Sequence, residues 1–576
     1  LTMKIFTTTL SLLFAVILGA QTPAERLLHQ LFEHDQAFLK KEFYELETPF
    51  PAVAEADELR RADFYRQELA LLQAIDPTLL ERNDRVSYEL FGFILQERIA
   101  ETEYGAYLVP LNAEGGWYTD FALEADGWRP KTADDYRRLL RRMAAFRNYA
   151  AENIRLMETG LKRGRTAPYD ILRGKETIVD AFITERPDDS PFFKPFRQMP
   201  AAIPADLQDS IRTAARVAIS QSLAPAYREF RKFWTEKYLP GAVRAPGIAA
   251  QPRGRAYYEE RVRYFTTLNM TPEEVFETGQ REVARIRAEM EATLRELKYA
   301  GSFADFLRFL RTDPQFYPAS PRALLMEGSY YAKKIDGKLP QYFGKLPRNP
   351  YGVSPVPDIL APTYTAGRYS PGNPKAQRAG FYWLNTYNLP ARPLYALPAL
   401  TLHEAVPGHH LQISLAQEME NVPEFRRNAY LSAFGEGWAL YGEWLGKEMG
   451  IYETPYEHFG RLTYEMWRAC RLVVDPGIHV MGWDREKAIQ FMTENTALSL
   501  HECTTEIDRY IGWPGQAVSY KIGELKIRDL RAKAEKELGD KFDIRAFHDL
   551  VLSEGTVPLY VLENLVDEWI AQIKKK

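Results

Sequence analysis

The distribution of proline most restricts the folds open to this 576-residue chain. Eleven of its 37 prolines lie between residues 337 and 400, and they are Pro340, Pro347, Pro350, Pro355, Pro357, Pro362, Pro371, Pro374, Pro390, Pro393 and Pro398. Because proline lacks an N–H group and clashes with the preceding helical turn, this segment cannot form long helices. Elsewhere apolar residues recur at spacings of three and four. The sequence therefore predicts a mainly α-helical fold with a partly β segment at 337–400.

The helical segments carry recognisable starts. At 271, Thr271 is a candidate N-cap, Pro272 occupies the first helical position and Glu274 completes a capping box. A buried stripe is expected to follow, consisting of Val275, Gly279, Val283, Ile286 and Met290. Further helices are predicted at 133–163, 303–311, 320–335, 424–449, 456–472, 484–500, 516–538 and 559–575.

One strand is predicted inside the proline-rich segment. Residues 380–386 are rich in aromatic side chains and bounded by turn residues. Because prolines flank this segment, we expect an edge strand that pairs with an extended peptide, with Tyr382 contacting the substrate.

Composition excludes several classes of protein. Hydrophobic residues make up 45% and charged residues 26% of the chain, as in ordinary globular proteins. With 74 Lys and Arg against 78 Asp and Glu, the net charge of −4 gives no basic excess for nucleic acid. The only cysteines, Cys470 and Cys503, exclude a disulfide scaffold, although the two could pair in an oxidising compartment.

The first twenty residues resemble a secretory signal peptide. Lys4 precedes a short apolar run from Leu10 to Leu18, and Gly19-Ala20 offers a cleavage site. Ala20 is not followed by cysteine, so no lipid anchor is predicted, and we expect an exported, periplasmic or secreted protein without a stable membrane anchor. The remaining chain divides into a helical region at 21–336, the segment at 337–400 and a helical catalytic region at 401–576.

Three histidines stand close together in the segment from Leu402 to Gln412. Zinc peptidases commonly place two histidines at i and i+4 on one helix, with a glutamate after the first as general base. Here Glu404 follows His403, but the next histidines are His409 and His410. Residues seven apart on a regular helix lie about 10.5 Å apart along its axis, too far to share one ion.

The Pro407-Gly408 pair offers a solution to this spacing problem. Proline removes a helical hydrogen bond and glycine tolerates the backbone that results. Without these two residues the spacing would be His-Glu-x-x-His, with His409 as the second ligand. We therefore predict a zinc site on a broken helix. His410 remains an alternative ligand, and is otherwise expected to bind substrate or to hydrogen-bond a ligand.

A catalytic zinc needs a third protein ligand and an open position. Glu436 lies in small and apolar surroundings, where a buried carboxylate requires a cation, so we predict it as that ligand. Glu443, two turns further along, is placed to hold a ligand histidine. Arg471, His479 and Tyr520 are candidates to stabilise an oxyanion or to bind substrate.

These motifs resemble the bacterial family known as domain of unknown function 885. The shared residues are the extended motif from His403 to His410, Arg392-Pro393, the segment Glu436–Tyr441, Asp475-x-Gly-Ile-His479 and the segment Pro514–Tyr520. The resemblance covers roughly residues 25–570. It implies a large, multi-helix fold like that of the Glu-zincin metallopeptidases, with a deep cleft.

The sequence as a whole predicts an exported zinc metallopeptidase that hydrolyses short peptides. In this hypothesis Glu404 activates a water molecule on zinc, and Tyr520 and His479 assist. Two alternatives stay open: a zinc amidohydrolase acting on a non-peptide or cell-wall amide, and a metal-free helical binding protein. The sequence does not predict the oligomeric state.

Overall fold

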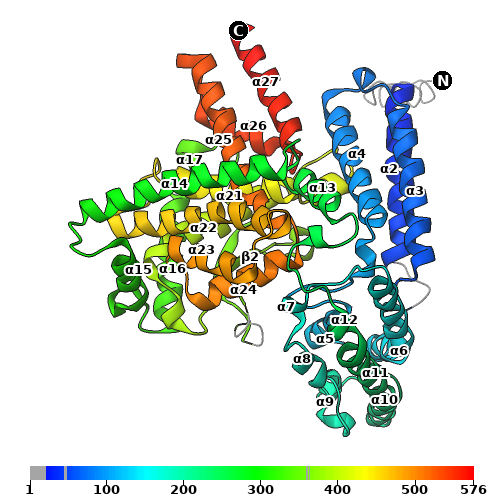
Figure 1. Ribbon diagram of the computed structural model, residues 1–576. Coiled ribbons are helices and arrows are strands. Elements are labelled where there is room, and N and C mark those ends of the chain that lie inside the picture. The colour runs from blue at the N-terminus through cyan, green and yellow to red at the C-terminus, as the bar shows by residue number, and fades with distance from the viewer. Residues whose placement is uncertain (1–20, 45–48, 359–360, 362–363, 576) are drawn as a thin grey trace, which may run out of the picture. The chain divides into compact units, whose positions relative to one another are not determined.

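The computed structural model describes residues 21–44, 49–358, 361 and 364–575. The chain divides into two compact units between Glu103 and Tyr104. Within the described residues the protein is mainly helical with one small sheet, as predicted (Figure 1). The predicted signal peptide at 1–20 lies outside the described residues, and the predicted division at 336 and 400 stays a prediction.

The described residues of the first unit form the α-helices α2 (Pro23–Leu39), α3 (Glu55–Gln73) and α4 (Arg82–Glu103). Thr22 caps α2 through a capping box with Glu25. The helices bury Leu28, Leu72 and Leu90. Apolar burial of this kind, and not helix propensity alone, stabilises such helices.

The second unit contains the other helices. They are α5 (Trp117–Gly127), α6 (Ala133–Lys162), α7 (Tyr169–Leu172), α8 (Glu176–Asp180), α9 (Lys194–Arg197), α10 (Ala205–Ala218), α11 (Ala224–Phe233), α12 (Leu239–Gly241), α13 (Gly254–Thr266), α14 (Pro272–Glu296), α15 (Phe303–Thr312), α16 (Pro321–Asp336), α17 (Leu339–Tyr342), α18 (Leu397–Glu404), α19 (His409–Gln417), α20 (Glu424–Asn428), α21 (Ser432–Leu445), α22 (Pro455–His479), α23 (Arg485–Asn495), α24 (Leu500–Gly512), α25 (Ser519–Leu538), α26 (Ile544–Ser553) and α27 (Leu559–Lys575).

Helices α14 and α22 pack along one another and form a long part of the core (Figure 1). The predicted cap of α14 is present, with Thr271 accepting a hydrogen bond from the backbone N–H of Glu274. The predicted stripe is buried except for Val283, which is half-buried. Gly279 permits the close approach, because a Cβ atom there would lie 2.7 Å from the side chain of Leu472.

Helices α21 and α25 cross at a pair of glycines. A Cβ atom on Gly437 would lie 2.6 Å from the backbone of Gly523, and one on Gly523 would lie 1.9 Å from the carbonyl oxygen of Ala433. Small residues therefore bring the two backbones together. This contact places α25, which begins near Tyr520, beside the helix that carries Glu436.

The sheet has three strands in the order β1-β3-β2, namely β1 (Tyr351–Pro355), β3 (Gly380–Leu384) and β2 (Gly367–Ser370). β1 pairs with β3 in parallel and β2 pairs with it antiparallel. The predicted strand thus exists, but the prediction that it is an edge strand was wrong. The flanking prolines lie beyond its ends, and both of its edges are paired. The edge strands are β1 and β2.

Two helix boundaries also differ from the prediction. The segment predicted as one helix at 424–449 is interrupted between Asn428 and Ser432, so α20 and α21 are separate. Conversely, α22 continues beyond 472 to His479 through Pro476. A helix can accommodate proline where neighbouring packing outweighs the lost hydrogen bond, and this stretch of α22 is buried throughout.

Among the described residues, no helix combines the length and the apolar character needed to span a bilayer. Cys470 and Cys503 are both buried and do not form a disulfide.

Asp475 on α22 is buried within this helical core. Its Oδ1 atom accepts hydrogen bonds from the hydroxyl of Tyr258 at 2.6 Å and from the backbone N–H of Gly515 at 3.0 Å. Burial raises the pKa of Asp475 to about 7, although these two hydrogen bonds and the charges of Arg509 and Arg471 oppose the rise. The ionised form is therefore penalised in the folded protein.

Replacing Asp475 with Asn is expected to flatten the pH dependence of stability. A carboxyl group with a raised folded-state pKa binds more protons folded than unfolded, so its contribution to stability is lost as pH rises toward 7. The free energy of unfolding of the native chain should fall between pH 5 and 8 by about 2 kcal/mol more than that of the variant. Urea titrations at both pH values measure this difference. The control is Asp540→Asn, which changes an exposed carboxylate and should behave as the native chain. If the free energy of unfolding of the Asp475 variant changes with pH as much as that of the native chain, the assignment is contradicted.

Candidate metal centre

The helix that carries the histidine motif is broken at the predicted place. α18 ends at Glu404 and α19 begins at His409. Ala405 (φ −93°, ψ −108°) and Gly408 (φ −70°, ψ −128°) leave the helical region. The backbone N–H of Gly408 donates to the carbonyl oxygen of Leu402 at 3.0 Å, six residues back, and so closes a wide turn. This turn shortens the path between His403 and His409, so His409 can serve as the second histidine of the site.

A steric restriction at Gly408 and a hydrogen bond from Trp438 fix this turn. A Cβ atom on Gly408 would lie 1.9 Å from the carbonyl oxygen of His403, so only glycine fits without displacing the backbone of the ligand. Trp438 on α21 is fully buried, and its Nε1 donates to the carbonyl oxygen of Pro407 at 2.7 Å. The helix that carries Glu436 thus also fixes the turn between the histidines.

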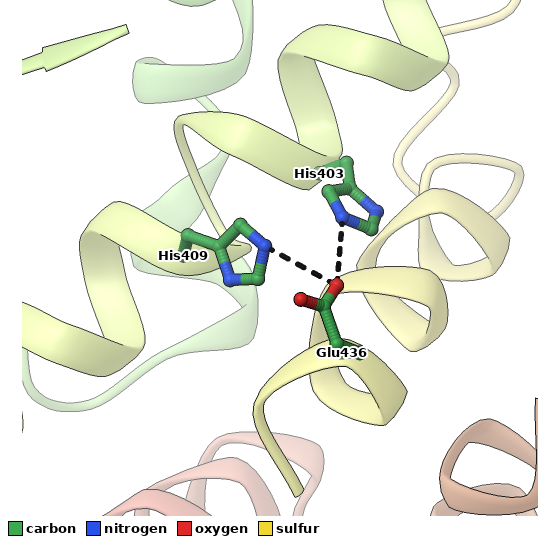
Figure 2. A group of neighbouring side chains, drawn as sticks. All are labelled: His403, His409 and Glu436. Atoms are coloured by element: carbon green, nitrogen blue, oxygen red, sulfur yellow. Dashed lines mark ion pairs between the residues drawn. The ribbon is translucent and has the colours of Figure 1, made fainter. Parts of the chain in front are cut away.

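The break brings His403 and His409 to one carboxylate, that of Glu436, as Figure 2 shows. The Oε2 atom of Glu436 lies 3.4 Å from Nε2 of His403 and 3.5 Å from Nε2 of His409. One donor atom from each residue lies within 4.8 Å of the others, and this is the metal-compatible cluster found in the described part of the chain.

These separations fit a metal ion better than direct hydrogen bonds. An N–H···O bond is usually 2.7–3.2 Å long, so 3.4 and 3.5 Å are too long for good ones. Zinc lies about 2.0–2.2 Å from histidine nitrogen and carboxylate oxygen, which places tetrahedral ligand atoms about 3.4 Å apart. The donor set, with two imidazoles and one carboxylate, is that of a catalytic zinc with one open position. The residues present therefore fit the predicted ion.

A second set of groups orients the three side chains. Oε1 of Glu443, which is buried, lies 2.8 Å from Nδ1 of His403, so the predicted contact is present. The hydroxyl of Tyr430 donates to Oε1 of Glu436 at 2.8 Å and leaves Oε2 facing the histidines. Gly435 makes room for the ring of Tyr430, since a Cβ atom there would lie 2.5 Å from it. Such outer contacts fix ring orientation and ligand basicity.

The electrostatics of the cluster are those of a cation-binding site. Burial would lower the pKa of His403, but the carboxylates of Glu436 and Glu443 raise it to about 9. Burial would raise the pKa of Glu436, but His409 and His403 hold it well below its usual range. Carboxylates therefore favour positive charge at the imidazoles, whether a proton or a metal ion supplies it.

Glu404 lies at the end of α18, directly after the first ligand. It is buried, and its Oε2 accepts a hydrogen bond from the backbone N–H of Tyr369 at 2.7 Å. Because Tyr369 belongs to β2, the outer edge of this edge strand faces Glu404. No sequence pattern in Gly367–Ser370 signals this contact, since a main-chain donor carries no residue preference.

Tyr520 and Arg471 lie together beside α21. The guanidinium carbon of Arg471 is 4.2 Å from the centre of the Tyr520 ring. Burial raises the pKa of Tyr520, and the charge of Glu436 is the next cause of the rise. Its hydroxyl has no hydrogen-bond partner among the described residues, so it is available to a ligand.

Arg471 itself was predicted to bind substrate, and the structure assigns it a different position. It is buried, with Nε donating to the hydroxyl of Tyr510 at 2.8 Å and Nη2 donating to Glu506 at 3.0 Å. Since its charge is paired with a carboxylate, Arg471 supports the ring of Tyr520 rather than presenting itself to substrate.

The structure does not bring His479, which was predicted as a catalytic residue, into the metal-compatible cluster. Its Nδ1 accepts a hydrogen bond from the backbone N–H of Ile248 at 3.2 Å, and its Nε2 donates to the carbonyl oxygen of Tyr510 at 3.0 Å. Both ring nitrogens are therefore engaged by backbone groups, and burial lowers its pKa to about 4. His479 joins α22 to its neighbours as a neutral structural residue.

His410 and Tyr382 are likewise part of the core and not of a substrate surface. Nδ1 of His410 lies 2.9 Å from the hydroxyl of Tyr369 and 3.2 Å from Oγ of Ser414, and burial lowers its pKa to about 4. Tyr382 is fully buried and its hydroxyl accepts from Thr401. The histidine that joins His403 is therefore His409, and the two residues predicted to bind substrate, His410 and Tyr382, are both buried.

Comparison with known proteins agrees with the motifs. The model of the family described as a bacterial protein of unknown function (DUF885) matches residues 43–566. The chain belongs to this family. A search of curated protein sequences found no match.

Two solved structures resemble this DUF885 protein over nearly its whole length. One is described as a candidate lipoprotein from Colwellia psychrerythraea, with 28% identity, a TM-score of 0.86 and coverage of 95% of this chain and 99% of that one. The other is described as a candidate lipoprotein of unknown function from Shewanella oneidensis, with 18% identity, a TM-score of 0.73 and coverage of 95% and 100%. The second likeness concerns the fold alone.

Gly408→Ala is expected to disrupt the centre even though the substitution adds one methyl group. The new Cβ would meet the carbonyl oxygen of His403, and relief of that overlap must move a predicted ligand. We expect a loss of stability on the order of 1–3 kcal/mol and substoichiometric zinc, measured by thermal unfolding and elemental analysis. Gly127→Ala, where nothing lies within 4 Å, is the control and should behave as the native chain. Full zinc content in the Gly408 variant would refute the steric argument.

Glu443→Gln is expected to weaken zinc binding by about 10- to 100-fold, as is usual when the partner of a ligand histidine is changed. The amide has nearly the same shape as the carboxylate but loses its charge, so the orientation and basicity of His403 suffer without a cavity. Competition with a chromogenic chelator measures the affinity. Glu448→Gln, just beyond α21 and paired with Arg531 instead, provides the matched control. An unchanged affinity in the Glu443 variant would mean that this contact serves the fold alone.

Proposed function

We propose that this DUF885 protein is a zinc-dependent peptidase that acts on short peptides. One observation carries the proposal. His403, His409 and Glu436 converge at separations suited to one ion, directly beside a glutamate that is held by the edge strand of a sheet. This combination of donor set, adjacent carboxylate and edge strand suits hydrolysis of an extended peptide. The resemblance to Glu-zincin peptidases noted in the sequence supports the same proposal.

Zinc bound at this cluster would supply a Lewis acid that polarises a carbonyl oxygen and acidifies a water molecule. Glu404 serves as the general base. The backbone N–H of Tyr369 occupies its Oε2 and fixes the carboxylate, which leaves Oε1 to take the proton from water and return it to the leaving amine. Because Glu404 is buried, its carboxylate is shielded from bulk solvent.

Tyr520 is proposed as the donor to the developing oxyanion. Its free hydroxyl meets the requirement for a hydrogen bond that forms only in the transition state. The guanidinium of Arg471, 4.2 Å from the ring centre, fixes the ring in place and adds positive charge behind it. Arg471 is thus a positioning residue.

The substrate backbone is proposed to pair with β2. Part of the outer edge of this strand faces the general base, whereas both edges of β3 are already used in the sheet. An extended peptide that runs along β2 would therefore pass next to the reacting groups. The deep cleft predicted from the sequence, which would favour short peptides over folded proteins, stays part of this proposal.

We also propose that the protein acts after export. The apolar segment at 1–20 has the pattern of a signal peptide, and the two structural neighbours are described as candidate lipoproteins.

A pair of variants separates zinc binding from catalysis. His403→Ala should lose stoichiometric zinc, because it removes one of three ligands. Glu404→Gln should keep one zinc per chain and lose on the order of 10² or more in turnover of a peptide library, because the amide cannot accept the proton. Elemental analysis and mass spectrometry of the digests give the two readouts.

Several outcomes would overturn the proposal. Full zinc content in the His403 variant would show that the ligands are misassigned, and full activity in the Glu404 variant would remove the general base. A zinc-loaded native protein that cleaves cell-wall amides but no peptide would replace the proposal with an amidohydrolase. A protein that binds no zinc at all would indicate a binding protein.

A further inference from the structure

Arg368 has an unusual position for an exposed residue, because its neighbour in β2 holds the general base. The peptide bond that follows Arg368 supplies the N–H group donated to Oε2 of Glu404. Its side chain alternates with that of buried Tyr369 and lies on the exposed face of the sheet, opposite Trp383. Arg368 is therefore tied to the catalytic carboxylate through the backbone while its guanidinium is accessible.

The charge of Arg368 has no ionic partner within the described residues. The other arginines around the proposed centre are paired, Arg471 with Glu506 at 3.0 Å and Arg468 with Glu443 at 3.6 Å. Desolvation would lower the pKa of Arg368, but interaction with Tyr364 and then the charges of Glu404 and Glu436 raise it. The guanidinium forms no ion pair with either carboxylate among the described residues, and it is the backbone hydrogen bond of Tyr369 that places this strand beside Glu404.

The Arg368 guanidinium hydrogen-bonds Tyr364 but has no carboxylate partner among the described residues, and a negatively charged group on the ligand would supply one. The backbone of a peptide is neutral everywhere except at its ends, so the only negative charge that every peptide offers, whatever its side chains, is the terminal carboxylate. A terminal carboxylate matches the planar, two-pronged donor geometry of arginine. Every peptide with a free C-terminus carries that group at a fixed number of residues from its last peptide bonds.

We propose that Arg368 binds the C-terminal carboxylate of the peptide, so that the protein removes residues from C-terminal ends rather than cutting within chains. This inference rests on the proposed peptidase function and deepens it. A substrate strand laid along β2 would present its terminal carboxylate to Arg368 while an adjacent peptide bond faces Glu404. Trp383, which pairs with Arg368 across the sheet, and Tyr364, which hydrogen-bonds it, have ring centres 6.3 Å apart.

The test measures binding apart from turnover. The Glu404→Gln variant, loaded with zinc, is titrated by calorimetry with N-acetylated tetrapeptides that end either in a free carboxylate or in a carboxamide. We expect the acids to bind about 10- to 100-fold more tightly than the amides, the range of one hydrogen-bonded charge. Adding Arg368→Gln should abolish this difference, and Arg368→Lys should restore part of it.

Arg378→Gln is the matched control. Arg378 lies between β2 and β3, is exposed, and donates to the carbonyl oxygen of Pro371, so its loss should leave the difference between acid and amide intact. Turnover by the native chain gives a parallel readout, in which acids should be cleaved and amides spared. In the Arg368→Gln protein, KM for the acids should rise.

The outcomes separate the two proposals. Equal binding of acids and amides overturns the role of Arg368, even if both are hydrolysed. Equal binding of acids and of amides that carry a glutamate side chain would mean that the site recognises acidic side chains, which also overturns it. Selective binding of acids without any hydrolysis by the native chain would support carboxylate recognition and refute the peptidase function.

Discussion

The four-residue interruption between α18 and α19 is the constraint on which the candidate centre depends. On a continuous helix His403 and His409 would point in different directions, since six residues rotate by about 600°. The wide turn closed by the N–H of Gly408 turns the second histidine back toward the first. The other parts of the centre contact this turn or face the histidines that it brings together. Trp438 fixes its carbonyl, Gly408 gives it space, and α21 supplies the carboxylate that faces both rings.

The second requirement is that α21 be placed accurately against the turn. One helix provides the carboxylate of Glu436, the indole that binds Pro407 and the buried carboxylate of Glu443. Its position is set on the other side by Gly437 and Gly523, where two backbones touch. Backbone contacts of this kind leave little freedom for sliding, because a packed interior has few voids into which a helix could shift. The centre is thus rigid because its supporting helix is fixed on both faces.

Much of the fold and of the candidate centre could be predicted from the sequence, because the features that signal them are patterns of neighbouring residues. The capping box at Thr271, the broken helix and the small-residue surroundings of Glu436 are patterns of adjacent residues, and the structure contains all three. What sequence reasoning missed depends on tertiary partners. In the sequence alone His479 and His410 are candidates for catalysis or binding. In the fold, backbone and hydroxyl groups from distant elements hydrogen-bond their ring nitrogens. Strand order in the sheet could not be read from β3 alone, because its neighbours are only five and four residues long.

The amide that orients Glu404 has a consequence for how such a centre can change over time. A main-chain N–H is present whatever side chain residue 369 carries, proline excepted, so substitutions along β2 leave the alignment of the carboxylate intact. The side chains of the same strand remain open to variation. One short strand therefore both orients Glu404, through its backbone, and presents variable side chains, and these two contributions can diverge separately. Related proteins could share a reaction while differing widely in what they recognise.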